Sequence, residues 1–279
     1  MIIDFHTHTF PDKIAETAIP KMQAMSHSTA FTKGTVTALK ESMLDAGIDY
    51  SVVLPVITNP PKTQNINDIS ISSNGKDGLF YFGGMHPESS DVSKELKRLK
   101  DNGIGGIKIH PIYQQADIDD IRFLRILYSA AENGLAVVTH SGDDIGFPGV
   151  RHCTVKMLIN ALKQVGDVTL IAAHMGGWKN WEEVEELASF KNLLVDTAFS
   201  IGSITPIDAH YSAEELSLLA EEEFLKLVKI FGSERVLFGT DSPWDCQKNL
   251  RETIENMPLS QNEKDNIFYK NAKRILKMR

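Results

Sequence analysis

The chain has 279 residues, a formal net charge of -8, 42% hydrophobic residues and 24% charged residues. These values are close to those of ordinary globular proteins, which excludes a disordered or fibrous chain. The acidic balance excludes the basic surface that would neutralise a nucleic-acid backbone, so we expect no nucleic-acid partner. No apolar run approaches the roughly 20 residues that a membrane helix needs, so we expect no membrane partner either.

The two cysteines, Cys153 and Cys246, lack the CxxC spacing typical of metal sites. Two free thiols are more typical of a reducing compartment than of a disulfide framework. The sequence begins MIIDFHTHTF, where Asp4 interrupts the pattern that a secretory signal requires. The prediction is a cytoplasmic protein.

Eight short apolar segments recur along the chain. Most of them lack polar alternation, which is typical of parallel strands covered on both faces. We expect strands at residues 2–6, 51–56, 79–84, 105–110, 135–140, 168–174, 193–197 and 235–241.

Segments with helical periodicity alternate with these strands. The clearest lie at 91–102, 118–133, 154–164, 180–190 and 212–231, and a last helix is expected at 262–277. No linker and no midpoint change in composition divides the chain, so the pattern predicts one domain over residues 1–279, an α/β fold with a single (β/α)8 TIM barrel. Residues 10–32 are too many for a simple turn and are expected to form a lid over the barrel mouth.

Three helix starts show the spacing of a capping box, in which a short polar residue precedes Glu by three positions. The pairs are Asn180 with Glu183, Ser212 with Glu215, and Ser260 with Glu263.

Polar side chains stand where several of the predicted strands end. His6 and His8 are two residues apart, so both imidazoles should lie on the same side of the first strand. His140, His174 and Asp241 end three later strands, and all strand ends of a barrel open onto one face. Unpaired polar groups there would cost several kcal/mol unless they bind something, which predicts a metal site rather than packed core histidines. Nitrogen and oxygen donors without thiolate favour Zn²⁺ and would also accept Mn²⁺, Fe²⁺ or Ni²⁺.

Seven motifs spread over the chain carry a resemblance to a known family. They are DFHTH (4–8), GIKIHP (106–111), VVTHSG (137–142), AAHMGGW (172–178), LVDTA (194–198), LFGTDSPW (237–244) and NAKRIL (271–276). The sequence resembles the amidohydrolase superfamily, in the branch of aminocarboxymuconate-semialdehyde decarboxylase and uncharacterised metal-dependent hydrolases.

The resemblance implies a distorted barrel of the metallo-dependent hydrolase type. It implies a metal ligated by His6, His8, His140 and Asp241, with His174 beside the metal-bound water. A zinc-bound water has a pKa of roughly 7. Asp241 could take its proton and later protonate the leaving group, while His174 orients the substrate carbonyl. These two residues are the predicted catalytic groups.

Lys108 leaves two alternatives open. Binuclear members of the superfamily carry a carboxylated lysine at this strand end, and Lys108 and His174 would then be ligands of a second metal. Otherwise Lys108 is a cation that binds a substrate carboxylate. We favour the single-metal case because the decarboxylase-like branch normally uses one metal.

Four further residues are candidates for substrate binding. His110 should face the same side as Lys108 if the strand continues that far. Arg151 could clamp a carboxylate bidentately, or be a solvated loop residue. Trp178 and Trp244 could wall a planar substrate, or anchor the core.

The leading hypothesis is a hydrolase that attacks a C–N or C–O bond of a small carboxylate-bearing molecule through metal-activated water. The alternative is a non-oxidative decarboxylase, a carboxy-lyase of an unsaturated or aromatic acid, which uses the same ligands. An alternative of another class is a catalytically silent metal- or ligand-binding protein. The expected partner is a small molecule, and the resemblance allows a homodimer.

Overall fold

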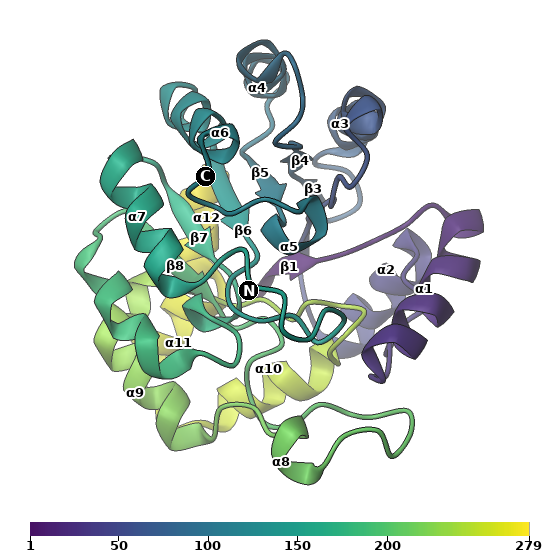
Figure 1. Cartoon of the computed structure of the whole chain (residues 1–279). Helices are drawn as coiled ribbons and strands as arrows, with labels where there is room; N and C mark the ends of the chain where they lie inside the picture. Colours follow the sequence, from purple (N-terminus) through teal and green to yellow (C-terminus); the bar gives the residue numbers. More distant parts are fainter. Residues whose placement is uncertain (279) are drawn as a thin grey trace.

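The computed structural model describes residues 1–278. Parallel strands lie at the centre of the molecule and helices surround them (Figure 1). The strands are β1 (Ile3–Thr7), β2 (Tyr50–Val53), β3 (Leu79–Tyr81), β4 (Gly83–Gly84), β5 (Gly106–Ile109), β6 (Ala136–Thr139), β7 (Leu170–Ala172), β8 (Leu193–Asp196) and β9 (Val236–Leu237).

The strands follow one another around a ring. They pair in the orders β1-β2-β3 and β4-β5-β6-β7-β8-β9. Only Phe82 separates β3 from β4, and its backbone N donates to Val53 O (3.1 Å). The two sheets also meet where β9 lies next to β1. There Phe5 N donates to Phe238 O (2.7 Å) and Asp241 N donates to His6 O (2.8 Å), which joins the last strand to the first along a seam. The predicted (β/α)8 barrel is therefore confirmed, with every expected strand present.

Helices cover the outside of the ring, and none within residues 1–278 is long and apolar enough to cross a membrane. The α-helices are α1 (Asp12–Ser26), α2 (Val36–Ala46), α3 (Thr63–Ser73), α4 (Val92–Asp101), α5 (Pro111–Gln114), α6 (Ile121–Glu132), α7 (Val155–Val165), α8 (Ala213–Leu216), α9 (Glu221–Phe231), α10 (Gln247–Asn256), α11 (Gln261–Asp265) and α12 (Asn271–Leu276). The 3-10 helices are η1 (Pro60–Lys62), η2 (His174–Gly176), η3 (Trp181–Ser189) and η4 (Ser233–Arg235), and η5 (Asn266–Lys270) is a π-helix.

Two helix predictions need correction. Residues 180–190 form the 3-10 helix η3 rather than an α-helix, and Asn180 does not cap it, because its side-chain amide donates to Trp178 O (2.9 Å). Residues 212–231 form two helices, because Ser217 and Leu219 bridge to Ser203 and Ile201 and so cannot continue a helix. The capping boxes that begin at Ser212 and Ser260 are confirmed.

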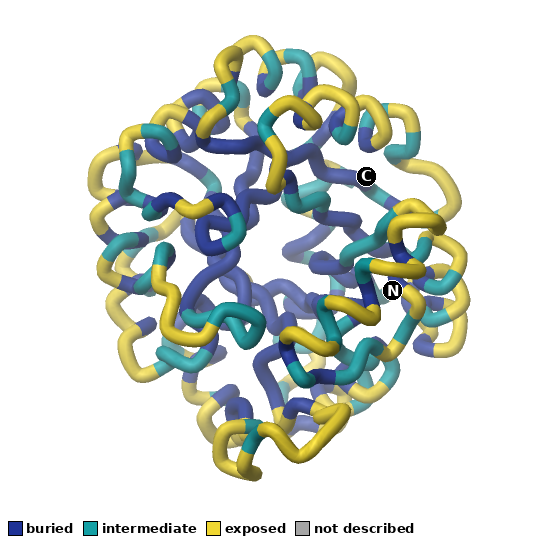
Figure 2. Tube along the Cα trace, turned by 45° about the vertical axis from the view of Figure 1, so that its right-hand side comes forward, coloured by how far each residue is buried: buried dark blue, intermediate teal, exposed yellow. Residues whose placement is uncertain are grey.

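Apolar side chains fill the inside of the ring, and the cavity lies at the carboxyl ends of the strands. Inside the ring Phe5 packs edge-on against Phe82, with 5.5 Å between ring centroids. Ile275 and Leu276 of α12 pack against the same apolar cluster. Figure 2 shows this buried centre and the exposed outer turns of the helices.

The predicted lid is the helix α1 with the residues around it. Met22 and Met25 of α1 line the cavity at the mouth. After α1, Thr29 N donates to Thr205 O (2.8 Å), and Ile207 N donates to His27 O (3.1 Å). The lid is thereby joined to the long loop after β8, which carries α8 at the edge of the molecule (Figure 1).

Candidate metal centre and active site

The two histidines of the first strand face the cavity together with Asp241. The register of β1 on β2 shifts between Asp4 and Thr7, just where His6 stands. His6 Nε2 lies 3.2 Å from His8 Nε2, and Asp241 Oδ1 lies 3.0 Å from His8 Nε2 and 3.4 Å from His6 Nε2. Asp241 adopts the left-handed region (φ 64°), a strained conformation that a functional site can maintain.

Asp4 holds the ends of the first and last strands in place. Its carboxylate accepts hydrogen bonds from Thr240 N (3.0 Å), Thr240 Oγ1 (2.6 Å) and Gln247 Nε2 (2.7 Å). Because Thr240 precedes Asp241 directly, this buried carboxylate helps to place the Asp241 side chain against the two histidines.

In both His6 and His8 the second ring nitrogen, Nδ1, has a hydrogen-bond acceptor that determines where the ring carries its proton. His6 Nδ1 donates to Asp196 Oδ2 (2.8 Å), and His8 Nδ1 donates to Leu54 O (2.7 Å). Both neutral rings therefore carry the proton on Nδ1 and present an Nε2 lone pair. Two lone pairs and a carboxylate oxygen that face one another favour a bound cation, and a hydrogen-bond acceptor on Nδ1 is typical of a metal-binding histidine. These residues fit a divalent metal.

His140 and His174 form a second pair of facing nitrogens in the same cavity. His174 Nδ1 donates to Ala198 O (2.9 Å), and His140 Nε2 donates to Asp143 O (3.1 Å). Their remaining nitrogens, His140 Nδ1 and His174 Nε2, stand 3.0 Å apart. In neutral rings these two atoms are both lone-pair acceptors, which again fits a cation.

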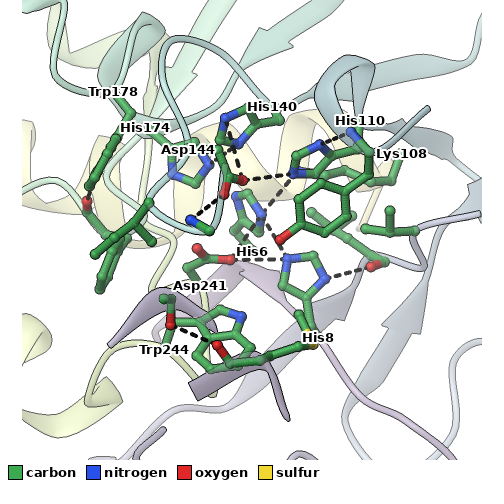
Figure 3. A pocket seen from close by; sticks show the side chains of 18 of the residues that line it. His6, His8, Lys108, His110, His140, Asp144, His174, Trp178, Asp241 and Trp244 are labelled. Atoms are coloured by element: carbon green, nitrogen blue, oxygen red, sulfur yellow. Dashed lines mark hydrogen bonds and ion pairs between the residues drawn. The ribbon is translucent and has the colours of Figure 1, made fainter. Parts of the chain in front are cut away.

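The two groups of donors are neighbours (Figure 3). The ring centroids of His6 and His174 are 5.3 Å apart, and those of His140 and His174 are 4.8 Å apart. The structure thus brings all five predicted side chains to one cavity. His140 contacts His174 rather than the trio of His6, His8 and Asp241, and its place in a four-ligand set stays a prediction.

The protonation states suit metal binding. Burial lowers the pKa of His6 and of His140 well below the usual value, and the neighbouring Lys108 (for His6) and His174 (for His140) lower it further. Burial raises the pKa of Asp241, but its interactions with His6 and His8, which include the hydrogen bond with His8, outweigh that effect and leave it low. At neutral pH the imidazoles of His6 and His140 are therefore neutral and the Asp241 carboxylate is ionised, which are the forms that bind metals.

Lys108 lies within the same group. Its Nζ stands 3.1 Å from His6 Nε2, and the residue is 1% exposed. Burial lowers its pKa to about 8, although the charge of Asp241 opposes the shift. An unprotonated amine, the form that can take up carbon dioxide, is therefore accessible near neutral pH, and the two alternatives for Lys108 both remain.

The cavity above these donors has a volume of about 310 Å³. Lys108, His110, Trp178 and Trp244 line it, as the sequence predicted. Arg151 does not line it, because its guanidinium forms a bidentate pair with Asp143 (2.9 and 3.2 Å) at an exposed position of the loop. The reading of Arg151 as a solvated loop residue therefore fits the structure better than the carboxylate clamp.

Sequence reasoning missed three side chains of the site. Asp196 accepts from His6 and also from the backbone N of His174 (2.8 Å), and its position in LVDTA at a strand end was an available signal. Asp144 lies 3.6 Å from His110 Nε2, and burial raises its pKa to about 7. Tyr113 lines the cavity and stacks on His110. The last two lie outside the predicted strands and gave no signal.

The comparisons with known proteins agree with this geometry. A family model described as amidohydrolase matches residues 3–278. The chain belongs to the amidohydrolase family. No curated protein matches it.

Solved structures show the same fold at low identity. An uncharacterised TIM-barrel protein from Bordetella bronchiseptica has a TM-score of 0.73 and 17% identity, with 99% of this chain and 98% of that chain covered. A 5-carboxyvanillate decarboxylase from Novosphingobium aromaticivorans with bound manganese has a TM-score of 0.71 and 13% identity, with 100% and 97% covered. A proposed 2-pyrone-4,6-dicarboxylic acid hydrolase from Pseudomonas putida has a TM-score of 0.67 and 15% identity, with 99% and 97% covered. This amidohydrolase is accordingly a metal-dependent enzyme of a superfamily that includes both hydrolases and decarboxylases.

Proposed function

We propose that this amidohydrolase hydrolyses a C–N or C–O bond of a small carboxylate-bearing molecule through metal-activated water. The observation that carries the proposal is the convergence of His6 Nε2, His8 Nε2 and Asp241 Oδ1 within 3.4 Å of one another on the cavity floor. His6, His8, Asp241 and His140 would hold one Zn²⁺, or Mn²⁺, Fe²⁺ or Ni²⁺ in its place. A second ion would bind at His174 if Lys108 were carboxylated.

The chain's own residues supply the rest of the chemistry. A zinc ion bound here would supply a water with a pKa of roughly 7. A carboxylate oxygen of Asp241 would accept a proton from that water and return it to the leaving atom, because the carboxylate is ionised and faces the cavity. Because His174 Nδ1 donates to Ala198 O, His174 would orient a substrate carbonyl by donating from Nε2 only when that nitrogen also carries a proton.

Non-oxidative decarboxylation is the second candidate, and the position of Lys108 favours it. The Lys108 amine lies beside His6, so it could bind the substrate carboxylate that leaves as carbon dioxide. Asp241, on the same cavity floor, could then protonate the carbon atom. The solved decarboxylases of similar fold are aromatic-acid enzymes by their names, which supports the same reading for this chain.

The reaction class is tested on the purified, metal-loaded enzyme. Esters, lactones and cyclic amides are assayed for acid release, and aromatic acids are assayed for carbon dioxide release. Acid release without carbon dioxide supports the hydrolase proposal. Release of carbon dioxide from an aromatic acid contradicts it and supports the decarboxylase. Anomalous scattering counts and identifies the metals, and density on the Lys108 amine shows whether it is carboxylated.

Asp241→Asn separates an enzyme from a silent metal-binding protein. The variant should lose at least about 100-fold in kcat, since a positioned acid–base group contributes 10²–10⁴-fold. Asp167→Asn, at an exposed position, is the matched control. Full activity in Asp241→Asn would remove the catalytic assignment, and metal content measured on the same sample distinguishes a lost base from a lost ion.

We further propose that the protein works in the cytoplasm on a small molecule, and that it forms a homodimer. Both cysteines are free in the structure, which suits a reducing compartment.

A further inference from the structure

The walls of the cavity are aromatic and apolar above the metal donors. Trp178 lies parallel to Phe199, with 6.1 Å between ring centroids and 10° between planes. Tyr113 stacks on His110 at 3.8 Å. These rings and Trp244 all line the cavity, and Figure 3 shows Trp178 and Trp244 among its lining side chains. Flat apolar walls of this kind suit a planar apolar substrate body.

Positive charge is confined to the floor. Among residues 1–278 no arginine lines the cavity, and Lys108 is the one lysine that does. The Lys108 amine is 3.1 Å from His6 Nε2. A substrate anion that binds to this amine therefore also lies beside the side chains that would hold the metal. Arg151, the nearest candidate for a second clamp along the sequence, does not line the cavity, and its guanidinium is already paired with Asp143.

Several further polar groups that line the cavity are neutral or acidic. Ser26 Oγ and Ser28 Oγ bond each other at 2.7 Å, and burial raises the pKa of Tyr113, which keeps its hydroxyl protonated. Asp143 and Asp144 also line the cavity. A second carboxylate on the substrate would therefore lose its hydrating water and contact apolar rings, hydroxyls and acids. The one guanidinium nearby, that of Arg151, is already paired with Asp143, so no unpaired cation would compensate.

We propose that the site takes substrates with one acyl or carboxylate group at the floor and an uncharged planar body, and that it rejects molecules with a second carboxylate. The inference rests on the proposed function only in placing the reacting group at the His6, His8 and Asp241 donors. Selection against a second anion follows from the walls, and it holds for hydrolysis and for decarboxylation alike.

The test is a binding measurement, which does not depend on turnover. The metal-loaded enzyme is titrated with 4-methylbenzoate and with terephthalate, two para-substituted benzoates that differ in a methyl or a carboxylate at the far end. Quenching of the tryptophans is followed, because Trp178 and Trp244 line the cavity. We expect terephthalate to bind at least about 100-fold more weakly. Equal or tighter binding of terephthalate overturns the proposal, and so does failure of 4-methylbenzoate to bind.

A gain-of-binding variant sharpens the test. Met25 lines the rim and is 42% exposed, so Met25→Arg should fold and place a guanidinium above the wall. This variant should bind terephthalate at least about 10-fold more tightly than the wild type, whereas the neutral control Met25→Gln should not. Equal effects of Arg and Gln contradict the charge argument. Loss of turnover without a change in this selectivity would count against the proposed reaction alone.

Discussion

At the scale of the residue, Asp196 connects two histidines of the site. One oxygen accepts from His6 Nδ1 (2.8 Å), and the other accepts from the backbone N of His174 (2.8 Å) and of Ala198 (3.2 Å). The carboxylate is fully buried. Because it accepts from Nδ1, it keeps the Nε2 lone pair of His6 directed at the cavity, which is the role of an outer-shell carboxylate in metal sites.

Asp196→Asn should therefore weaken metal binding by about 10- to 100-fold. An asparagine oxygen can still accept from His174 N, but its amide would face the Nδ1 proton of His6 and drive that proton to Nε2, the nitrogen that binds metal. Competition with a chromogenic chelator on metal-free protein measures the affinity, with Asp167→Asn as the exposed control. Unchanged affinity in Asp196→Asn would show that this carboxylate does not set the His6 tautomer.

Asp245 gives a prediction about stability and pH. Burial raises its pKa to about 7, while its side chain accepts from Cys246 N (2.7 Å). The folded state binds this proton more tightly than the unfolded state, so below pH 4 ionisation costs nothing, and the cost grows as the pH rises to 7. Asp245→Asn keeps the acceptor and should be more stable than the wild type by about 1–3 kcal/mol at pH 8 and equal to it at pH 4. Urea unfolding at both pH values measures this, and a difference that does not change with pH would rule it out.

At the scale of the element, backbone hydrogen bonds join the loop after β6 to the loop after β7. Trp178 N donates to Ser141 O (2.9 Å) and Asp143 N donates to Trp178 O (3.0 Å), while Gly142 N donates to Cys153 O (2.9 Å) within the loop after β6. These bonds hold the carbonyl of Asp143 against His140 and the ring of Trp178 in the cavity wall. Close backbone approach is possible because Gly142 has φ 90° and no side chain.

Gly142→Ala should destabilise the protein by more than about 3 kcal/mol, since the new Cβ would overlap the backbone of Trp178 and leave the loops unable to pair. Gly103→Ala is the matched control: its φ is 79°, and a Cβ there meets nothing within 4 Å, so only the roughly 1–2 kcal/mol of left-handed strain is expected. Thermal unfolding of both variants separates overlap from strain. Equal losses would mean that the loop contact contributes nothing.

The sequence predicted those helices and strands whose form depends on residues close together in the chain, and it failed where contacts between distant residues decide the form. The eight strands are apolar runs because both of their faces are covered, so the sequence alone located them. The break between α8 and α9 depends on bridges to residues 201 and 203, and Asn180 does not cap η3 because its side-chain amide donates to Trp178 O instead. Arg151 and Asp144 belong to a loop without periodicity, where side-chain direction is set by contacts that the sequence does not reveal.

At the scale of the whole molecule, the site lies on the seam where the ring closes. The donors come from β1, from the ends of β6 and β7, and from the segment after β9, a strand of only two residues. Five predicted positions met at one cavity because a closed parallel barrel directs every strand end to the same face, a constraint on topology rather than on any local pattern. The partners that orient them, such as Asp196 and the carbonyl of Leu54, could be recognised only once the strands were in place.

Removal of the metal should loosen this seam. A bound ion would link His6 and His8 of the first strand to Asp241 after the last strand, and a ligand at 100 times its Kd stabilises the folded state by about 2.7 kcal/mol. Chelation should therefore lower the Tm by roughly 5–10 °C for a chain of this size, and added Zn²⁺ should restore it. His8→Gln, which replaces a partly exposed donor, should start at the lower Tm and hardly respond to chelation. If chelation lowers the Tm of wild type and variant equally, the ion binds elsewhere, and the link across the seam is absent.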